Sequence, residues 1–316
     1  MDITVVVPLL NEAESLPELC SRIKAVMESH SFSYEILMID DGSTDSSWEC
    51  LCGLAKSDPC IHGIRFRRNY GKSAALYCGF EKARGEVVVT MDADLQDAPE
   101  EIPELYRMVT EEDYDLVSGW KRRRKDNALT KNLPSKLYNA TARLITGIKL
   151  HDMNCGLKAY RKDVVKSVEV YGEMHRYIPY LAKNAGFTRI GEKEVHHEKR
   201  KYGKSKFGVE RFVNGFLDLQ SLWFLSTFGK KPMHFFGFSG LVMFLAGFVM
   251  TVWIIAAKLV HQASGVRFRA VTEQPLFYLA LLCVVLGVML FLAGLLGEMI
   301  ARSAPERNSY NIKEEL

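Results

Sequence analysis

The sequence predicts an α/β protein: a mostly parallel sheet with helices on both faces, followed by interfacial amphipathic helices and a C-terminal hairpin of two transmembrane helices. Two observations predict this fold. Up to residue 118, short apolar runs alternate with segments of helical apolar spacing, which is the pattern of strand–helix units. Beyond residue 234, two long stretches carry no charged residue at all.

Five apolar runs are predicted as buried strands, and the segments between them as helices. The strands are expected at residues 3–8, 34–39, 61–66, 87–91 and 115–118. Helices are expected at residues 14–29 and 72–83, with another after the sequence "DDGSTDSS". Ligands of such sheets bind at the carboxyl ends of the strands, so the polar motifs found there are candidates for function.

Two uncharged stretches, at residues 235–257 and 276–297, are each long enough to cross about 30 Å of hydrocarbon. The alternative, two buried helices of a soluble core, is disfavoured by their length and lack of charge. We expect transmembrane helices at about 235–258 and 275–298. The predicted domains are therefore a cytoplasmic catalytic domain at 1–205, an amphipathic juxtamembrane segment at 206–233, the hairpin at 234–300 and a polar cytoplasmic tail at 301–316.

The N-terminus "MDITVVVPLLNE" lacks a basic segment and does not resemble a signal peptide, which predicts a cytoplasmic location for the large N-terminal part. Lys230, Lys231 and Arg302 lie on the expected cytoplasmic side of the hairpin, whereas Arg267 and Arg269 in its loop weaken that signal. The net charge of +3 gives no indication of nucleic-acid binding. Seven cysteines without a CxxC pair predict reduced thiols.

The stretch "DADLQD" places three carboxylates directly after the fourth predicted strand, with no basic residue among them. Carboxylates that close repel one another, which suggests that a required cation is missing from the chain itself. Oxygen ligands on a turn suit Mg²⁺ or Mn²⁺, and Mg²⁺ completes its shell with substrate phosphates. The stretch therefore predicts a metal-bridged nucleotide diphosphate, with a solvated acidic turn as the alternative.

Two further polar motifs follow neighbouring strands and raise the odds of a site. "DDGSTD" places Asp40 and Asp41 at the end of the second strand, and "PLLNE" places Asn11 and Glu12 at the end of the first. Polar motifs at three strand ends of one sheet form a coherent binding site.

Together these motifs resemble the family 2 glycosyltransferases, which have the GT-A fold. The stretches "VVPLLNE", "IDDGSTD", "RNYGKSAALYCGF", "DADLQDAPE", "HDMNCGLKAY" and "KYGKSKF" resemble the polyprenyl-phosphate glycosyltransferases of the dolichol-phosphate-mannose synthase-like group. The whole architecture resembles the bacterial two-span members that glucosylate undecaprenyl phosphate. The processive members carry a QxxRW motif that this chain lacks, which argues against a polysaccharide synthase.

The resemblance implies a role for each motif residue. It implies that Asp94 and Gln96 hold Mg²⁺ or Mn²⁺ with the diphosphate. It places Lys72 near the nucleotide or the sugar, although a solvated lysine in a first helical turn would look the same. The residues implied to line the nucleotide pocket are Pro8, Asn11, Glu12, Asp41 and Asp92.

For the acceptor, the resemblance implies that Asp152 of "HDMNCGLKAY" acts as a base or positions the acceptor. Leu157 stands where the family usually has an aromatic residue. An anionic lipid phosphate needs cations, and Arg122 and Lys206 are the first candidates. Lys204 and Arg176 are further candidates.

The expected activity is inverting transfer of a sugar, with glucose from UDP-glucose as first choice, to undecaprenyl or another polyprenyl phosphate at a bacterial inner membrane. GDP-mannose and UDP-galactose remain open as donors. The family also suggests a homotetramer. One alternative is a catalytically silent nucleotide-sugar binder that partners a flippase. Another is a glycosyltransferase that acts on a nonlipid glycan.

Overall fold

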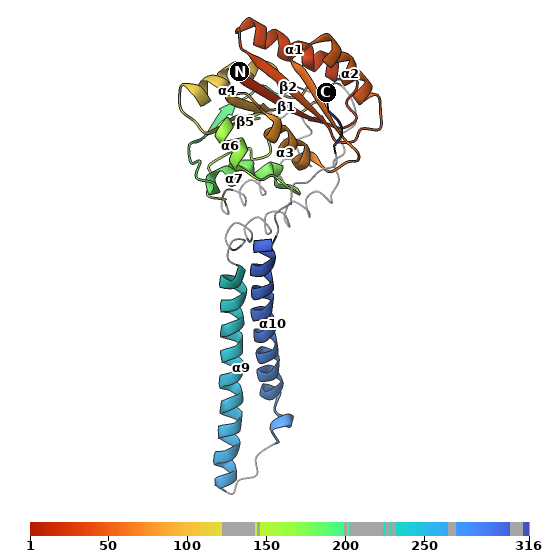
Figure 1. Ribbon diagram of the computed structural model, residues 1–316. Coiled ribbons are helices and arrows are strands. Elements are labelled where there is room, and N and C mark those ends of the chain that lie inside the picture. Colours follow the sequence, from red (N-terminus) through yellow and green to blue (C-terminus); the bar gives the residue numbers. More distant parts are fainter. Residues whose placement is uncertain are drawn as a thin grey trace. The chain divides into compact units, whose positions relative to one another are not determined.

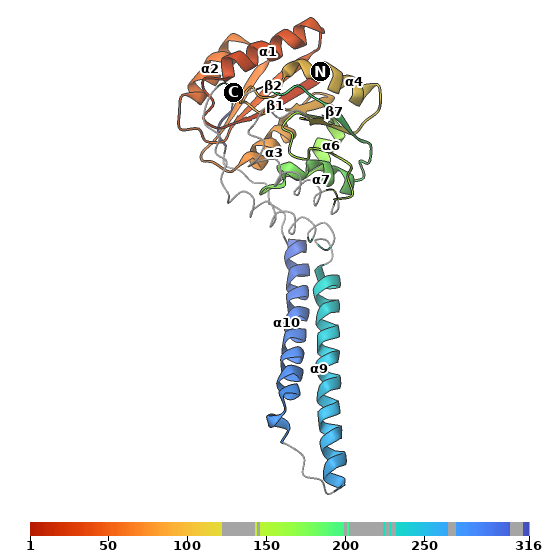
Figure 2. The ribbon, with the colours of Figure 1, turned by 180° about the vertical axis from the view of Figure 1, so that it is seen from behind.

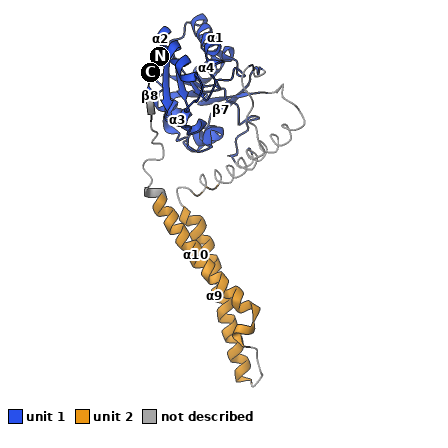
Figure 3. Ribbon diagram, turned by 90° about the vertical axis from the view of Figure 1, so that its right-hand side faces the viewer, with its two compact units in different colours: residues 1–220, 307–316 blue, residues 221–306 orange. Residues whose placement is uncertain are grey.

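The computed structural model describes residues 1–121, 143, 146–198, 201, 224, 228, 232–264, 270–303 and 312–315. The chain forms two compact units (Figure 3). The sheet unit comprises Met1–Gln220 and Arg307–Leu316, and the hairpin unit comprises Ser221–Glu306. Most of the predicted amphipathic segment at 206–233 lies outside the described residues, so the four-part domain division stays a prediction.

The sheet unit contains an eight-stranded sheet in the order β7-β5-β6-β4-β1-β2-β3-β8. β6 and β8 run antiparallel to their neighbours and the other pairs are parallel, which confirms a mostly parallel sheet. All five predicted strands are present, as β1 to β5. The strands are β1 (Ile3–Leu9), β2 (Tyr34–Asp40), β3 (Ile61–Phe66), β4 (Val87–Thr90), β5 (Leu116–Trp120), β6 (Lys158–Arg161), β7 (Ile190–Glu194) and β8 (Ile312–Glu315).

Helices cover both faces of this sheet, as predicted (Figures 1 and 2). One face packs against α1 (Leu16–Ser29), α2 (Ser47–Ser57) and α4 (Ile102–Thr110), whose apolar residues share one core with the strands. The opposite face carries α3 (Lys72–Lys82), α6 (Lys162–Ser167) and α7 (Ile178–Asn184). Short 3₁₀ helices η1 (Pro99–Glu101) and η2 (Met174–Tyr177) precede α4 and α7. Because helices cover both faces of the sheet, a ligand-binding site is expected at the carboxyl ends of the parallel strands.

The C-terminal end of the chain returns to the sheet, which the sequence does not predict. β8 pairs antiparallel with β3, and the Lys82 ammonium of α3 lies 2.7 Å from the Glu315 carboxylate. This last strand covers the edge of β3, whose backbone groups would otherwise lack a neighbour on that side.

The hairpin unit consists of α9 (Pro232–Ala263) and α10 (Pro275–Ser303), joined through η3 (Val271–Glu273). By length and composition both helices can span a membrane, as predicted. Glycines bring their backbones together: a Cβ at Gly247 would lie 2.7 Å from the Ala280 carbonyl oxygen, and one at Gly287 would lie 2.6 Å from the Phe244 nitrogen. Phe248, Trp253 and many other large apolar side chains face outward, which suits a lipid environment.

Candidate active site

Three strand ends meet around one cleft of about 300 Å³. The segments after β1, β2 and β4 contribute its walls, together with the start of α3. The structure therefore brings together the three polar motifs that the sequence singled out. The lining residues are Pro8, Leu9, Leu10, Glu12, Asp41, Asn69, Gly71, Lys72, Asp92, Ala93 and Asp94.

The charge of the carboxylate stretch is balanced by lysines from distant segments. The Lys72 ammonium, at the start of α3, forms an ion pair with the Asp92 carboxylate. Burial alone would raise the pKa of Asp92, but the charges of Lys72, Lys121 and Lys158 outweigh it and hold that pKa well below its usual range. The expectation that the required cation comes only from outside the chain is therefore wrong for Asp92.

Asp97, the third carboxylate of the stretch, is buried and forms an ion pair with a lysine from another segment. It is fully buried, and its Oδ1 lies 2.6 Å from the ammonium of Lys121, the residue that follows β5. A Cβ at Gly156 would lie 2.7 Å from Asp92 Oδ2 and 2.9 Å from Asp97 Oδ2. Only glycine allows the backbone of the "NCGLKAY" stretch to lie against both carboxylates, so this stretch packs directly beneath the carboxylate loop.

Asp94, which the motif predicts to be a metal ligand, lies in this cleft. It lines the cleft, it is 9% exposed, and its Oδ1 accepts a hydrogen bond of 3.2 Å from the Gln96 backbone N–H. Among the described residues, no three His, Cys, Asp or Glu side chains are grouped so that they alone could hold an ion. The donor set therefore fits Mg²⁺ or Mn²⁺ where substrate phosphate oxygens complete the shell.

Asp41 at the end of β2 is held by the backbone of the loop before α3. Its carboxylate accepts hydrogen bonds from the N–H groups of Tyr70 (2.7 Å) and Gly71 (2.9 Å). Burial raises the pKa of Asp41, although these two hydrogen bonds oppose the shift. The carboxylate thus fixes one wall of the cleft while lining it.

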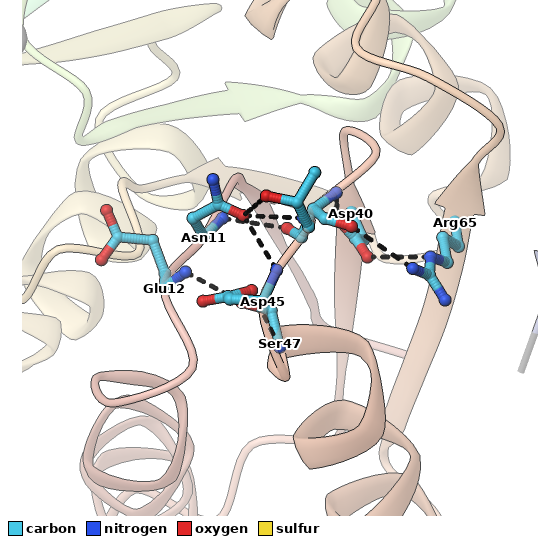
Figure 4. A network of polar contacts seen from close by, with 8 residues as sticks. Asn11, Glu12, Asp40, Asp45, Ser47 and Arg65 are labelled. Atoms are coloured by element: carbon cyan, nitrogen blue, oxygen red, sulfur yellow. Dashed lines mark hydrogen bonds and ion pairs between the residues drawn. The ribbon is translucent and has the colours of Figure 1, made fainter.

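Asn11 and Glu12 organise the loops after β1 and β2 (Figure 4). Asn11 has a positive φ of 57°, and its side-chain oxygen accepts a hydrogen bond of 2.8 Å from the Thr44 N–H. The Glu12 N–H donates to Ser47 Oγ at 2.9 Å, and the Glu12 side chain points away from this network (Figure 4). Glu12 and Pro8 line the cleft, whereas Asn11 shapes the loop behind it.

Asp152 lies in the loop before β6 and is 2% exposed. Its Oδ1 accepts a hydrogen bond of 3.1 Å from the Asn154 N–H. Asn154, Cys155 and Gly156 then line a cavity of about 20 Å³ that Lys72 and Asp92 also border. The acceptor motif and the carboxylate cleft therefore share a wall.

Three basic residues that border this small cavity were not ranked first by sequence reasoning. Lys158 of β6 is almost fully buried, and its ammonium donates to the Cys155 carbonyl oxygen. Burial lowers the pKa of Lys158, and burial also holds the pKa of His175 well below its usual range. Arg176 lines the cavity, is 8% exposed, and lies 3.3 Å from the Glu173 carboxylate. A lysine inside the apolar stretch "GLKAY" was the available signal for Lys158.

The first candidates for the acceptor phosphate, Arg122 and Lys206, lie outside the described residues, as does Lys204. The Gln96 side chain is half-buried, and the backbone N–H of Gln96 donates to Asp94 Oδ1. Lys121, just before Arg122, is the last described residue of that segment, and its pairing with Asp97 brings the segment to the carboxylate loop.

Comparison with known proteins decides the family. The model of glycosyl transferase family 2 matches residues 4–168. The chain belongs to glycosyl transferase family 2. It is a glycosyltransferase, and its relatives place it in the polyprenyl-phosphate group, as the motifs indicated.

Two relatives match nearly the whole chain, including both apolar helices. Dodecaprenyl-phosphate galacturonate synthase of Rhizobium johnstonii is 33% identical over 96% of this chain and 88% of its own. Undecaprenyl-phosphate 4-deoxy-4-formamido-L-arabinose transferase of Shewanella sediminis is 37% identical over 95% and 87%.

Solved structures give the fold. Glucosyl-3-phosphoglycerate synthase of Mycobacterium tuberculosis, in complex with Mn²⁺ and UDP-glucose, matches with a TM-score of 0.54. It is 19% identical and covers 71% of this chain and 78% of its own. At this identity the likeness shows the fold alone, which is GT-A as expected.

Proposed function

We propose that this glycosyltransferase moves a sugar from a nucleoside diphosphate donor to the phosphate of a polyprenyl phosphate. The observation that carries the proposal is the shared wall between the carboxylate cleft and the Asp152 motif. The names of the relatives support the acceptor, because dodecaprenyl and undecaprenyl phosphate are the lipids that they name. Two apolar helices that are long enough to span a membrane support a reaction at a membrane surface.

The identity of the donated sugar is less well defined than that of the acceptor lipid. The resemblance to two-span glucosylating enzymes favours UDP-glucose, whereas the relatives are named for galacturonate and for a formamido-arabinose. Galacturonate differs from glucose at C4 and C6, and the formamido-arabinose is a pentose that carries a formamido group at C4 and has no C6. UDP-glucose is therefore the first donor to test, beside donors carrying these modified sugars and GDP-mannose.

Each charged residue that lines the cleft has a proposed role in this transfer. When bound, Mg²⁺ or Mn²⁺ supplies positive charge that stabilises the leaving diphosphate. Asp94, with Gln96, would hold that ion. Lys72 keeps Asp92 charged and presents its own ammonium to the cleft, where Asp41 and Glu12 face the nucleotide.

The bonds balance in a single displacement. An oxygen of the lipid phosphate forms a bond to the anomeric carbon, and the bond from that carbon to the β-phosphate oxygen breaks. The nucleoside diphosphate leaves with the electron pair, and the configuration inverts. A phosphate monoester is largely ionised at neutral pH, since its second pKa is about 6, so Asp152 positions the acceptor and need not take a proton.

The deciding experiment is a donor screen on the full-length enzyme in membranes, with product mass measured on polyprenyl phosphate. One donor should give a lipid-phosphate sugar, and Asp152→Asn should form that product much more slowly, at a rate that can still be measured, while donor binding persists. No product with any donor would support the silent nucleotide-sugar binder. Transfer to a soluble glycan instead would overturn the lipid acceptor.

The proposal includes a cytoplasmic sheet unit at a bacterial inner membrane, with both chain ends on the cytoplasmic side. Labelling of a cysteine introduced between α9 and α10, with a reagent that cannot cross the membrane, tests this topology. The homotetramer that the resemblance implies stays a prediction, and the mass of the purified enzyme in detergent would test it.

A further inference from the structure

The carboxylate of Glu192, on β7, holds the loop that carries Asp152 through hydrogen bonds. Its Oε1 accepts hydrogen bonds from two successive backbone N–H groups, those of His151 (2.8 Å) and Asp152 (3.1 Å). Its Oε2 lies 2.7 Å from Nδ1 of His151. The Glu192 side chain is only 12% exposed, whereas that of His151 is 56% exposed, so the carboxylate is shielded and its contact with the His151 ring is open to solvent. Hydrogen bonds to a shielded carboxylate are stronger than neutral ones.

Glu192 lies on a strand that is itself held in the sheet by pairing with its neighbour. β7 pairs in parallel with β5, and Glu192 lies opposite Ser118, which is fully buried. Trp120, at the end of β5, stacks on the His151 ring with centroids 4.3 Å apart and planes 19° apart. The acceptor loop is therefore held at His151 from both strands, β5 through a ring stack and β7 through a carboxylate.

We propose that Glu192 is a positioning residue for the transfer, acting through Asp152; this rests on the proposed role of Asp152 in placing the acceptor. The loop needs such a support because Asp152 stands before β6, outside any regular element. Four residues later, Gly156 lies against Asp92 and Asp97. Glu192 thus fixes one end of a short segment whose other end lies against the carboxylate loop.

The test compares Glu192→Ala, Glu192→Gln and Asp152→Asn, alone and combined, in the full-length enzyme. Glu194→Ala is the matched control, because it removes a carboxylate from an exposed position two residues along the same strand. The readouts are kcat and KM for polyprenyl phosphate, donor affinity by calorimetry, and Tm. A lost charge-assisted grip predicts about a tenfold to hundredfold fall in kcat for Glu192→Ala, with donor affinity retained.

Two further results identify the mechanism. Glu192→Gln keeps an oxygen that can accept from both N–H groups, so it should restore most of kcat. In the Asp152→Asn background, Glu192→Ala should cost little more, because residues that act as a unit are non-additive. The inference would be overturned if the fold losses in kcat of the two single variants multiplied in the double variant. It would also be overturned if Glu194→Ala lowered kcat as much as Glu192→Ala does. Full activity of Asp152→Asn alone would instead overturn the proposed role of Asp152.

Discussion

The two halves of the sheet build their parts of the site in different ways. One half, made of β4, β1, β2 and β3, is the one that we propose binds the donor and is called the donor half; it is all parallel and comes from the first 90 residues in one continuous pattern. The acceptor half, made of β7, β5 and β6, mixes parallel and antiparallel pairs from segments far apart in the sequence. The donor half places carboxylates at strand ends, whereas the acceptor half must place a loop.

This difference explains which contacts hold each functional group. In the donor half, Asp41 is held by neighbouring backbone N–H groups. In the acceptor half, Asp152 depends on a side chain from another strand, Glu192. Changes in the donor half should therefore affect donor and metal directly, and changes in the acceptor half should affect the use of the lipid.

The largest effect is expected for Asp94→Asn in the donor half. Loss of this carboxylate should remove the metal dependence of nucleotide binding and lower transfer by about a thousandfold, since a catalytic ion stabilises several kcal/mol of developing charge. Calorimetry with and without Mn²⁺ checks nucleotide binding, the transfer assay checks the rate, and Tm checks that the variant is folded. Normal turnover of the variant in excess chelator would contradict the metal site.

Arg122→Ala and Lys206→Ala should affect the lipid side. Loss of one charge-assisted contact of about 1.5 to 3 kcal/mol predicts roughly a tenfold to hundredfold fall in kcat/KM for polyprenyl phosphate. Donor affinity should change little in either variant. As a control, Lys56→Ala replaces an exposed lysine of α2 and should change neither kcat/KM for the lipid nor donor affinity. If donor binding collapses while the KM for the lipid holds, both residues belong to the donor half.

The sequence predicts the donor half well because its strands are buried on both faces. Their continuous apolar runs, such as "ITVVVPL", are clear signals. β6 and β7 read "KAYR" and "IGEKE", too short and too polar to stand out as strands. Their pairing depends on the tertiary fold, so the acceptor half could not be assembled from local pattern.

The same limit applies within the site. Motif spacing brought Asp92, Asp94 and Asp41 to one cleft, because strand ends of one parallel sheet must meet. It did not reveal that Lys121 neutralises Asp97, or that Glu192 holds the Asp152 loop. These partners lie 24 and 40 residues away, and nothing in a single sequence pairs such residues.

A smaller effect is expected for Lys72→Met. The lowered pKa of Asp92 means that its charge stabilises the fold above the unfolded-state pKa of about 4, and that this stabilisation is lost as pH falls through the folded-state pKa. The variant should thus lower Tm near neutral pH, and the difference should shrink in acid. Donor affinity should fall about tenfold. A Tm difference that grows in acid would contradict the ion pair.

The smallest effect is expected at the outer edge of the donor half, where Lys82 meets Glu315 of β8. The two side chains are 44% and 48% exposed, so solvent screens their attraction. Lys82→Ala should lower Tm by no more than about 2 °C and leave transfer unchanged, because β8 is held to β3 mainly by backbone pairing. Thermal unfolding of full-length enzyme checks this. A large loss of transfer would mean that the returning strand couples to the cleft, and that the donor half does not end at β3.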